Sequence, residues 1–129
     1  MRAALEGDAV VRQALEAAEH CVTSRLTLIE CARALRRAEV SGRLARKDRY
    51  LTQAWVDDFL AGAYVMAVDA AVTTRASQEF ALEPVRSLDA IHLASVCVWD
   101  AALPRLQVAS CDVQLRDNLD AMGYALVPA

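Results

Sequence analysis

The chain has 129 residues, of which 56% are hydrophobic and 5% aromatic, and its formal net charge is −3. This length suits one domain over residues 1–129 with a substantial core built mainly from Ala, Leu and Val. The sequence contains no window of eighteen uncharged apolar residues and no apolar h-region behind its early acids, so it predicts neither a membrane span nor a secretory signal. We therefore expect a cytoplasmic protein.

Helical and strand-like segments alternate along the chain. In chain order we expect a helix at 9–18, a strand at 20–23, helices at 25–40 and 44–60, a buried strand at 63–68, a helix from 69 to about 82, a helix beginning at 87, a strand at 106–109, a helix at about 112–122 and a strand at 124–127. Gly42 is expected to end the second helix, and Asp69 and Ser87 to cap later ones. Short strands separated by helices indicate an α/β domain with a mostly parallel sheet.

The positive charge is concentrated in residues 33–49, where seven cationic side chains stand against two acids. This stretch carries +5, which leaves −8 for the rest of the chain. A concentrated basic surface can hold a polyanion while acids elsewhere hold its cations. A solvated helical face explains the same pattern, and both interpretations stay open.

Cysteine and histidine usage does not favour a zinc site. The four cysteines form no C-x-x-C pair, and two histidines accompany them. In a reducing compartment this pattern predicts small buried hydrophobic side chains and no disulfide framework, for Cys21, Cys31, Cys97 and Cys111.

Three acids stand beside apolar runs in a similar way. Asp89 lies in the first turn of an otherwise apolar helix, Glu30 follows residues 26–29, and Asp112 follows residues 106–111. In a parallel α/β sheet, ligands collect at the edge where the strands end. Convergent carboxylates repel one another unless a divalent cation neutralises them, and ligands that are all oxygen favour Mg²⁺ or Mn²⁺ over zinc. The three acids therefore predict a shared metal site.

Each acid also has a structural explanation. Glu30 lies three residues after Thr27 and can close a capping box. Asp89 is favoured by the helix dipole, and Asp112 suits an N-cap. His92, one turn after Asp89, either reaches that acid or is a hydrogen-bonded core histidine. The sequence contains no glycine-rich phosphate loop and no G-x-S-x-G elbow, so P-loop and serine-hydrolase chemistry are poorly supported.

Three blocks of sequence carry a resemblance to a known family. They are residues 22–35, residues 85–94 (Val-Arg-Ser-Leu-Asp-Ala-Ile-His-Leu-Ala), and residues 107–112 running on to Leu115 and the Gly-Tyr pair at 123–124. These blocks resemble the PIN-domain family, and within it the VapC-like toxins of type II toxin–antitoxin systems. The Leu-Asp-Ala-Ile-His-Leu-Ala segment is the most specific part.

The resemblance implies a three-layer α/β/α fold with a mostly parallel central sheet and a ribonuclease that depends on Mg²⁺ or Mn²⁺. It implies that Glu30, Asp89 and Asp112 are catalytic, metal-site carboxylates that hold an activated water for hydrolysis of RNA. It also implies a homodimer and a cognate antitoxin that holds the toxin inactive. The RNA-binding candidates are cations of the basic stretch and one cation beside Asp89: Arg33, Arg36, Arg37, Arg43 and Arg86.

The chain departs from the family pattern at its beginning. The family opens with a hydrophobic strand that carries a central metal-binding Asp, whereas residues 1–8 resemble the helix after that strand. Asp8 follows no strand and is not assigned the missing role. Without that strand its neighbours in the sheet would keep unpaired backbone groups, so we expect a start codon placed too late, a fragment, or another segment in the gap.

Two functions follow from these observations. The first is a metal-dependent endoribonuclease of the toxin–antitoxin type, with metal binding and cleavage weakened because three acids replace four. The alternative is a catalytically impaired PIN-like module that binds an antitoxin or RNA without cleaving it. A small-molecule enzyme on a doubly wound sheet has no cofactor fingerprint to support it.

Overall fold

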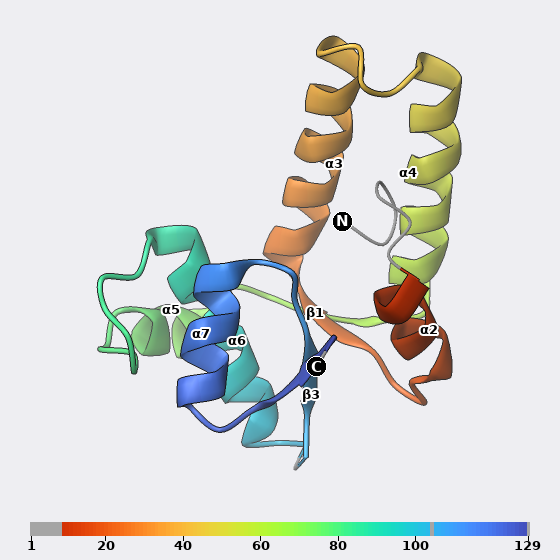
Figure 1. Ribbon diagram of the computed structural model, residues 1–129. Coiled ribbons are helices and arrows are strands. Elements are labelled where there is room, and N and C mark those ends of the chain that lie inside the picture. Colours follow the sequence, from red (N-terminus) through yellow and green to blue (C-terminus); the bar gives the residue numbers. More distant parts are fainter. Residues whose placement is uncertain (1–8, 104, 129) are drawn as a thin grey trace. The chain divides into compact units, whose positions relative to one another are not determined.

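The computed structural model describes residues 9–103 and 105–128 (Figure 1). The predictions made for residues 1–8, including the question of a role for Asp8, lie outside the described residues. Within the part of the chain that is described, no helix is long and apolar enough to cross a bilayer.

The chain divides into two compact units, residues 1–66 and residues 67–129, and each is described by itself. The first unit contains α2 (Ala9–Ala17), β1 (Val22–Ser24), α3 (Arg25–Val40), α4 (Arg46–Ala61) and β2 (Tyr64–Met66). Strands β1 and β2 pair in parallel, and helices α3 and α4 lie side by side as a long hairpin (Figure 1). The expected helix at 25–40 is confirmed at both ends.

Helix α3 has a hydrogen-bonded cap at each end. The Ser24 hydroxyl accepts a hydrogen bond from the Leu26 amide at 3.2 Å, which satisfies one of the unpaired amides of the first turn. At the other end Gly42 adopts a φ of 72°, and the Arg43 amide donates back to the Ala38 carbonyl at 2.9 Å. The predicted role of Gly42 is confirmed. The capping box considered as an alternative for Glu30 does not form, because the cap lies at Ser24.

The core of the first unit is centred on one row of α3. Cys31, Leu35 and Ala38 are buried at i, i+4 and i+7, and Val56 of α4 is buried as well. Ile29 belongs to the same helix but is 60% exposed. Six residues of helix turn Ile29 about 120° away from Leu35, so it lies beside the buried row rather than in it.

The second unit contains α5 (Ala70–Ala76), α6 (Ser87–Asp100), β3 (Gln107–Ala109), α7 (Val113–Ala121) and β4 (Ala125–Val127). Strands β3 and β4 pair in parallel, with Gln107 opposite Ala125. Helix α6 packs on α5 through buried small and branched residues, among them Val72, Ala90, Leu93 and Ala94. The short parallel strands and surrounding helices agree with the expected α/β class.

Three local expectations are corrected by the observed elements. Helix α5 ends at Ala76 instead of near residue 82, because residues 77–86 form a loop in which Phe80 is buried. The N-cap position of α6 belongs to Arg86, so Ser87 is the first helical residue. The strand predicted at 63–68 is shorter and less buried than expected, since Tyr64 is 58% exposed. The Asp69 cap is confirmed, with bonds to two amides of α5.

Candidate metal and nucleic-acid site

Asp89 lies in the first turn of α6 and is held by a neighbouring cation. The Arg86 Nε atom donates to its Oδ2 atom at 2.7 Å, across one helical turn. Arg86 reaches this position because it occupies the extended N-cap site, with φ −72° and ψ 151°. The Asp89 side chain is 14% exposed, whereas that of Arg86 is 69% exposed. The pair therefore joins a largely covered carboxylate to a solvated guanidinium.

Asp112 lies just after β3 and acts on the same guanidinium. The hydrogen bond and charge of Asp89 raise the pKa of Arg86 above its usual value, and the charge of Asp112 raises it further. The Asp112 carboxylate also caps α7, where its Oδ1 atom accepts from the Leu115 amide at 3.1 Å. The cap expected from the sequence is confirmed, and Asp89 and Asp112 both stabilise one positive charge.

Glu30 belongs to the first unit, whereas Asp89 and Asp112 belong to the second. It lies in the second turn of α3 and is half-buried. Its neighbour Cys31 is buried, and that burial raises the pKa of the Cys31 thiol, with a smaller contribution from Glu30. Of the three predicted acids, two are brought together by the fold of a single unit.

The donor set can be tested against a divalent cation. Within residues 9–103 and 105–128, no three His, Cys, Asp or Glu side chains form a group that could hold a metal ion. The Asp89 carboxylate nevertheless binds the Arg86 guanidinium directly, and the charge of Asp112 acts on the same guanidinium. Carboxylate oxygens are the ligands that Mg²⁺ and Mn²⁺ prefer, so this pair fits part of such a site.

A pocket of about 210 Å³ borders Asp89, and most of its polar lining was not predicted from the sequence. It lies between the loop at residues 82–85 and helix α7, with Gln114, Asp117 and Asn118 on the helix side. Glu83 holds the loop: its carboxylate accepts from the Phe80 and Val85 amides at 3.0 and 2.7 Å. That role depends on the loop conformation, which no local pattern reveals.

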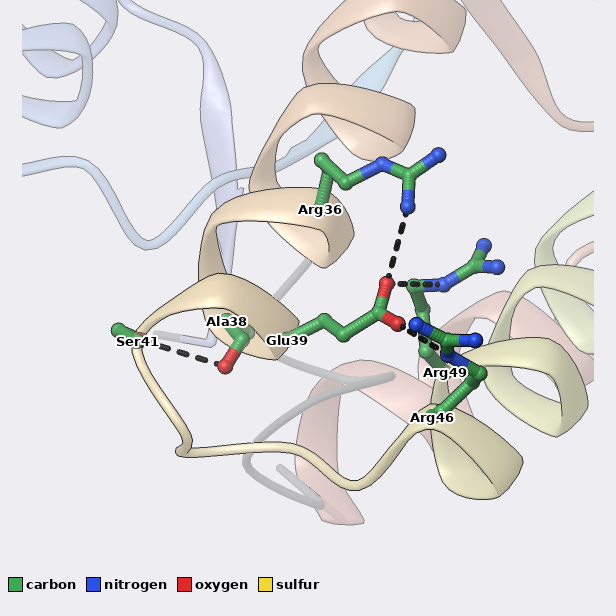
Figure 2. Close-up of polar contacts among 6 residues, drawn as sticks. All are labelled: Arg36, Ala38, Glu39, Ser41, Arg46 and Arg49. Atoms are coloured by element: carbon green, nitrogen blue, oxygen red, sulfur yellow. Dashed lines mark hydrogen bonds and ion pairs between the residues drawn. The ribbon is translucent and has the colours of Figure 1, made fainter.

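The basic stretch folds as the α3–α4 hairpin, and three of its arginines converge on Glu39. Figure 2 shows the Glu39 carboxylate between Arg36 of its own helix and Arg46 and Arg49 of α4. The nitrogen–oxygen distances are 3.2, 3.1 and 2.7 Å respectively. Burial alone would raise the pKa of Glu39, but the Arg46 hydrogen bond and the charges of Arg49, Arg36 and Arg46 outweigh it and lower that pKa. The cluster ties α3 to α4.

The hairpin keeps a surplus of exposed positive charge. One carboxylate serves three guanidinium groups, and the side chains of Arg36 and Arg46 remain 57% and 80% exposed. The four predicted RNA-binding residues of this stretch are all exposed: Arg33, Arg36, Arg37 and Arg43. Arg46 and Arg49 were not predicted as partners of Glu39, although an acid in the middle of seven cations was a usable signal.

The comparison with protein families identifies the class of protein. The model of the PIN domain matches residues 4–118, and the chain belongs to that family. No curated protein matches the chain. PIN domains have a three-layer α/β/α fold, which confirms the predicted fold class. They are generally metal-dependent nucleases that act on RNA, and they typically bind divalent metals, so the predicted nuclease class is confirmed at that level.

Proposed function

We propose that this chain is an Mg²⁺- or Mn²⁺-dependent endoribonuclease of the VapC-like toxin–antitoxin type, with Glu30, Asp89 and Asp112 as its metal-site carboxylates. The observation that carries the proposal is the contact between the covered Asp89 carboxylate and Arg86, whose charge Asp112 also stabilises, in a chain of a nuclease family. The VapC-like assignment is supported by the sequence blocks at residues 22–35, 85–94 and 107–112.

Different residues of the chain have different roles in the proposed reaction. A bound divalent cation supplies positive charge for the scissile phosphate and lowers the pKa of a water molecule. Asp89 and Asp112 hold their carboxylates at the N-termini of α6 and α7. The exposed Arg86 guanidinium suits bidentate contact with an RNA phosphate beside these acids. Arg33, Arg36, Arg37 and Arg43 add sequence-independent contacts to the RNA backbone.

The proposal extends to the assembly. We propose that residues 1–129 act as one domain, which is supported by a family match that runs without a break across both units. We also propose a homodimer held inactive by a cognate antitoxin protein, supported by the same resemblance.

A cleavage assay with chelation tests the proposed activity. Structured RNA is incubated with the protein and Mg²⁺, with and without EDTA, in parallel with Asp89→Asn and with Asp120→Asn as a control at an exposed site on α7. We expect chelator-sensitive cleavage by the wild type and the control, and a loss of at least about 100-fold in Asp89→Asn, because even outer partners of metal ligands contribute 10- to 100-fold. Equal cleavage by Asp89→Asn, or cleavage unaffected by EDTA, overturns the proposal.

The exposed arginines of the hairpin favour a second candidate. They bind phosphates without needing a metal ion, so a PIN-like module that holds RNA or an antitoxin without cutting is consistent with the same surface. Such a module would bind RNA in EDTA with a steep salt dependence and would leave the RNA intact in Mg²⁺. Chelator-sensitive cleavage by the same preparation excludes it.

A further inference from the structure

The two partners of the Arg86–Asp89 contact differ in their exposure to water, and this difference affects cation binding. Asp89 is largely covered, and its Oδ2 atom is engaged at 2.7 Å, a short charge-assisted hydrogen bond. Arg86 is mostly in water, so its head group can leave the carboxylate and be rehydrated at little cost. A cation of higher charge that approaches Asp89 meets a partner that is easily displaced.

We propose that Arg86 is an internal competitor for the divalent cation at Asp89, and that its release sets the affinity of this site for metal. The inference rests on the proposed function, because it takes Asp89 as a metal ligand. The guanidinium occupies one of the two oxygens of Asp89, and its positive charge also interacts with that of the second acid, Asp112. A divalent cation must therefore displace the Arg86 head group or bind against its repulsion.

The same exchange links metal binding to RNA binding. A guanidinium released from Asp89 lies beside the site with its donors free for a phosphate, which matches its fork geometry. A phosphate that draws Arg86 away from Asp89 removes the competitor, so RNA and metal each strengthen the binding of the other. Arg86 is in this sense a positioning residue whose partner changes when substrate arrives.

Mn²⁺ titration without any cleavage readout tests the inference. Free Mn²⁺ is followed by electron paramagnetic resonance at fixed ionic strength for the wild type, Arg86→Gln, Arg86→Lys and Asp89→Asn. Lys47→Gln, an exposed change of the same charge in α4, is the control. We expect Arg86→Gln to bind Mn²⁺ about 2- to 5-fold more tightly, the scale of an exposed ion pair, and Arg86→Lys and Lys47→Gln to stay near the wild type.

The outcomes separate this inference from the proposed function. Equal or weaker Mn²⁺ binding by Arg86→Gln overturns the competition, even when Asp89→Asn loses Mn²⁺ as the proposed function requires. Unchanged binding by Asp89→Asn, or no Mn²⁺ binding by the wild type and Arg86→Gln alike, overturns both. Circular dichroism of each variant verifies the fold, so that a weaker affinity is not mistaken for unfolding.

A second arm tests the link to RNA. A 2′-O-methyl oligonucleotide, which resists cleavage, is added to the same titrations. We expect it to tighten Mn²⁺ binding more in the wild type than in Arg86→Gln, where no competitor remains to be removed. An equal effect on both proteins contradicts the proposed exchange.

Discussion

Asn118 shows how one buried side chain fixes the surroundings of Asp89. Its amide forms two hydrogen bonds with the backbone of Leu82, accepting from the amide and donating to the carbonyl, both at 2.9 Å. Asn118 is only 5% exposed, and these bonds satisfy its buried amide group. The loop it holds lines the pocket beside Asp89. A polar residue three positions after Leu115, within an apolar row of α7, is a sequence signal for such a buried amide.

Replacing this amide should cost stability. Asn118→Leu leaves the amide and carbonyl of Leu82 without partners, which we expect to lower the free energy of unfolding by about 1–3 kcal/mol. Gln114→Leu, an exposed change on the same helix, should alter it by less than about 0.5 kcal/mol. Urea denaturation measures both. Equal stability of the two variants would show that the loop does not depend on Asn118.

Single residues of the site were predictable where local spacing decides their position. Asp89 in the first turn of a helix and Asp112 as a cap both follow from short-range patterns, and both are found in those places. Glu30 lies within α3 and not at its start, because Ser24 ends β1 and caps α3 at the same point. Tertiary packing decides which carboxylates act on the same cation. The spacing of residues along the sequence does not reveal it.

At the scale of elements, the α3–α4 hairpin is held by charge as well as by its apolar row. Glu39 and Arg49 are largely covered, with side chains 12% and 13% exposed, and they join the two helices at 2.7 Å. Removing one partner of such a covered pair leaves the other charge poorly compensated. The number of cations in the sequence predicted a basic surface. The covered position of Arg49 could not be predicted in the same way, because it depends on the packing of α4 against α3.

Glu39 gives the hairpin a defined dependence on pH. Because the folded state lowers the pKa of Glu39, its ionised form stabilises the fold at neutral pH, and this contribution is lost as pH falls below the ordinary value of 4.5 and through the folded pKa. We expect Glu39→Gln to melt roughly a few degrees lower than the wild type at pH 7. The difference should shrink progressively below pH 4.5. Thermal melts across this range measure it.

A control separates Glu39 from the general effect of acid. Asp58→Asn removes an exposed carboxylate from the last part of α4. It should not lower the melting temperature at pH 7 by a comparable amount. A constant difference between Glu39→Gln and the wild type from pH 7 to pH 3 would contradict the role assigned to the Glu39 charge.

At the scale of the whole molecule, the alternation of elements was enough to predict the class of fold. Helices were placed well because their apolar period repeats over many residues, as in α3. Strands were placed less well because each has three residues and is defined by a partner far along the chain, as Val22 is by Tyr64. The early end of α5 escaped prediction because the burial of Phe80 under the Arg75 guanidinium, 4.2 Å from the ring centre, depends on the folded loop.

The central claim is that Asp89 and Asp112 act together on one cation during cleavage of RNA. A double-mutant cycle of single-turnover rates in saturating Mn²⁺ tests it most directly, using Asp89→Asn, Asp112→Asn and the double variant. Asn keeps the helix cap at residue 112, so the fold is preserved. We predict that each single change lowers the rate by about 100-fold and that the double change lowers it little further, as for groups that act as a unit. Losses that multiply, or single variants that cleave like the wild type, would contradict the account.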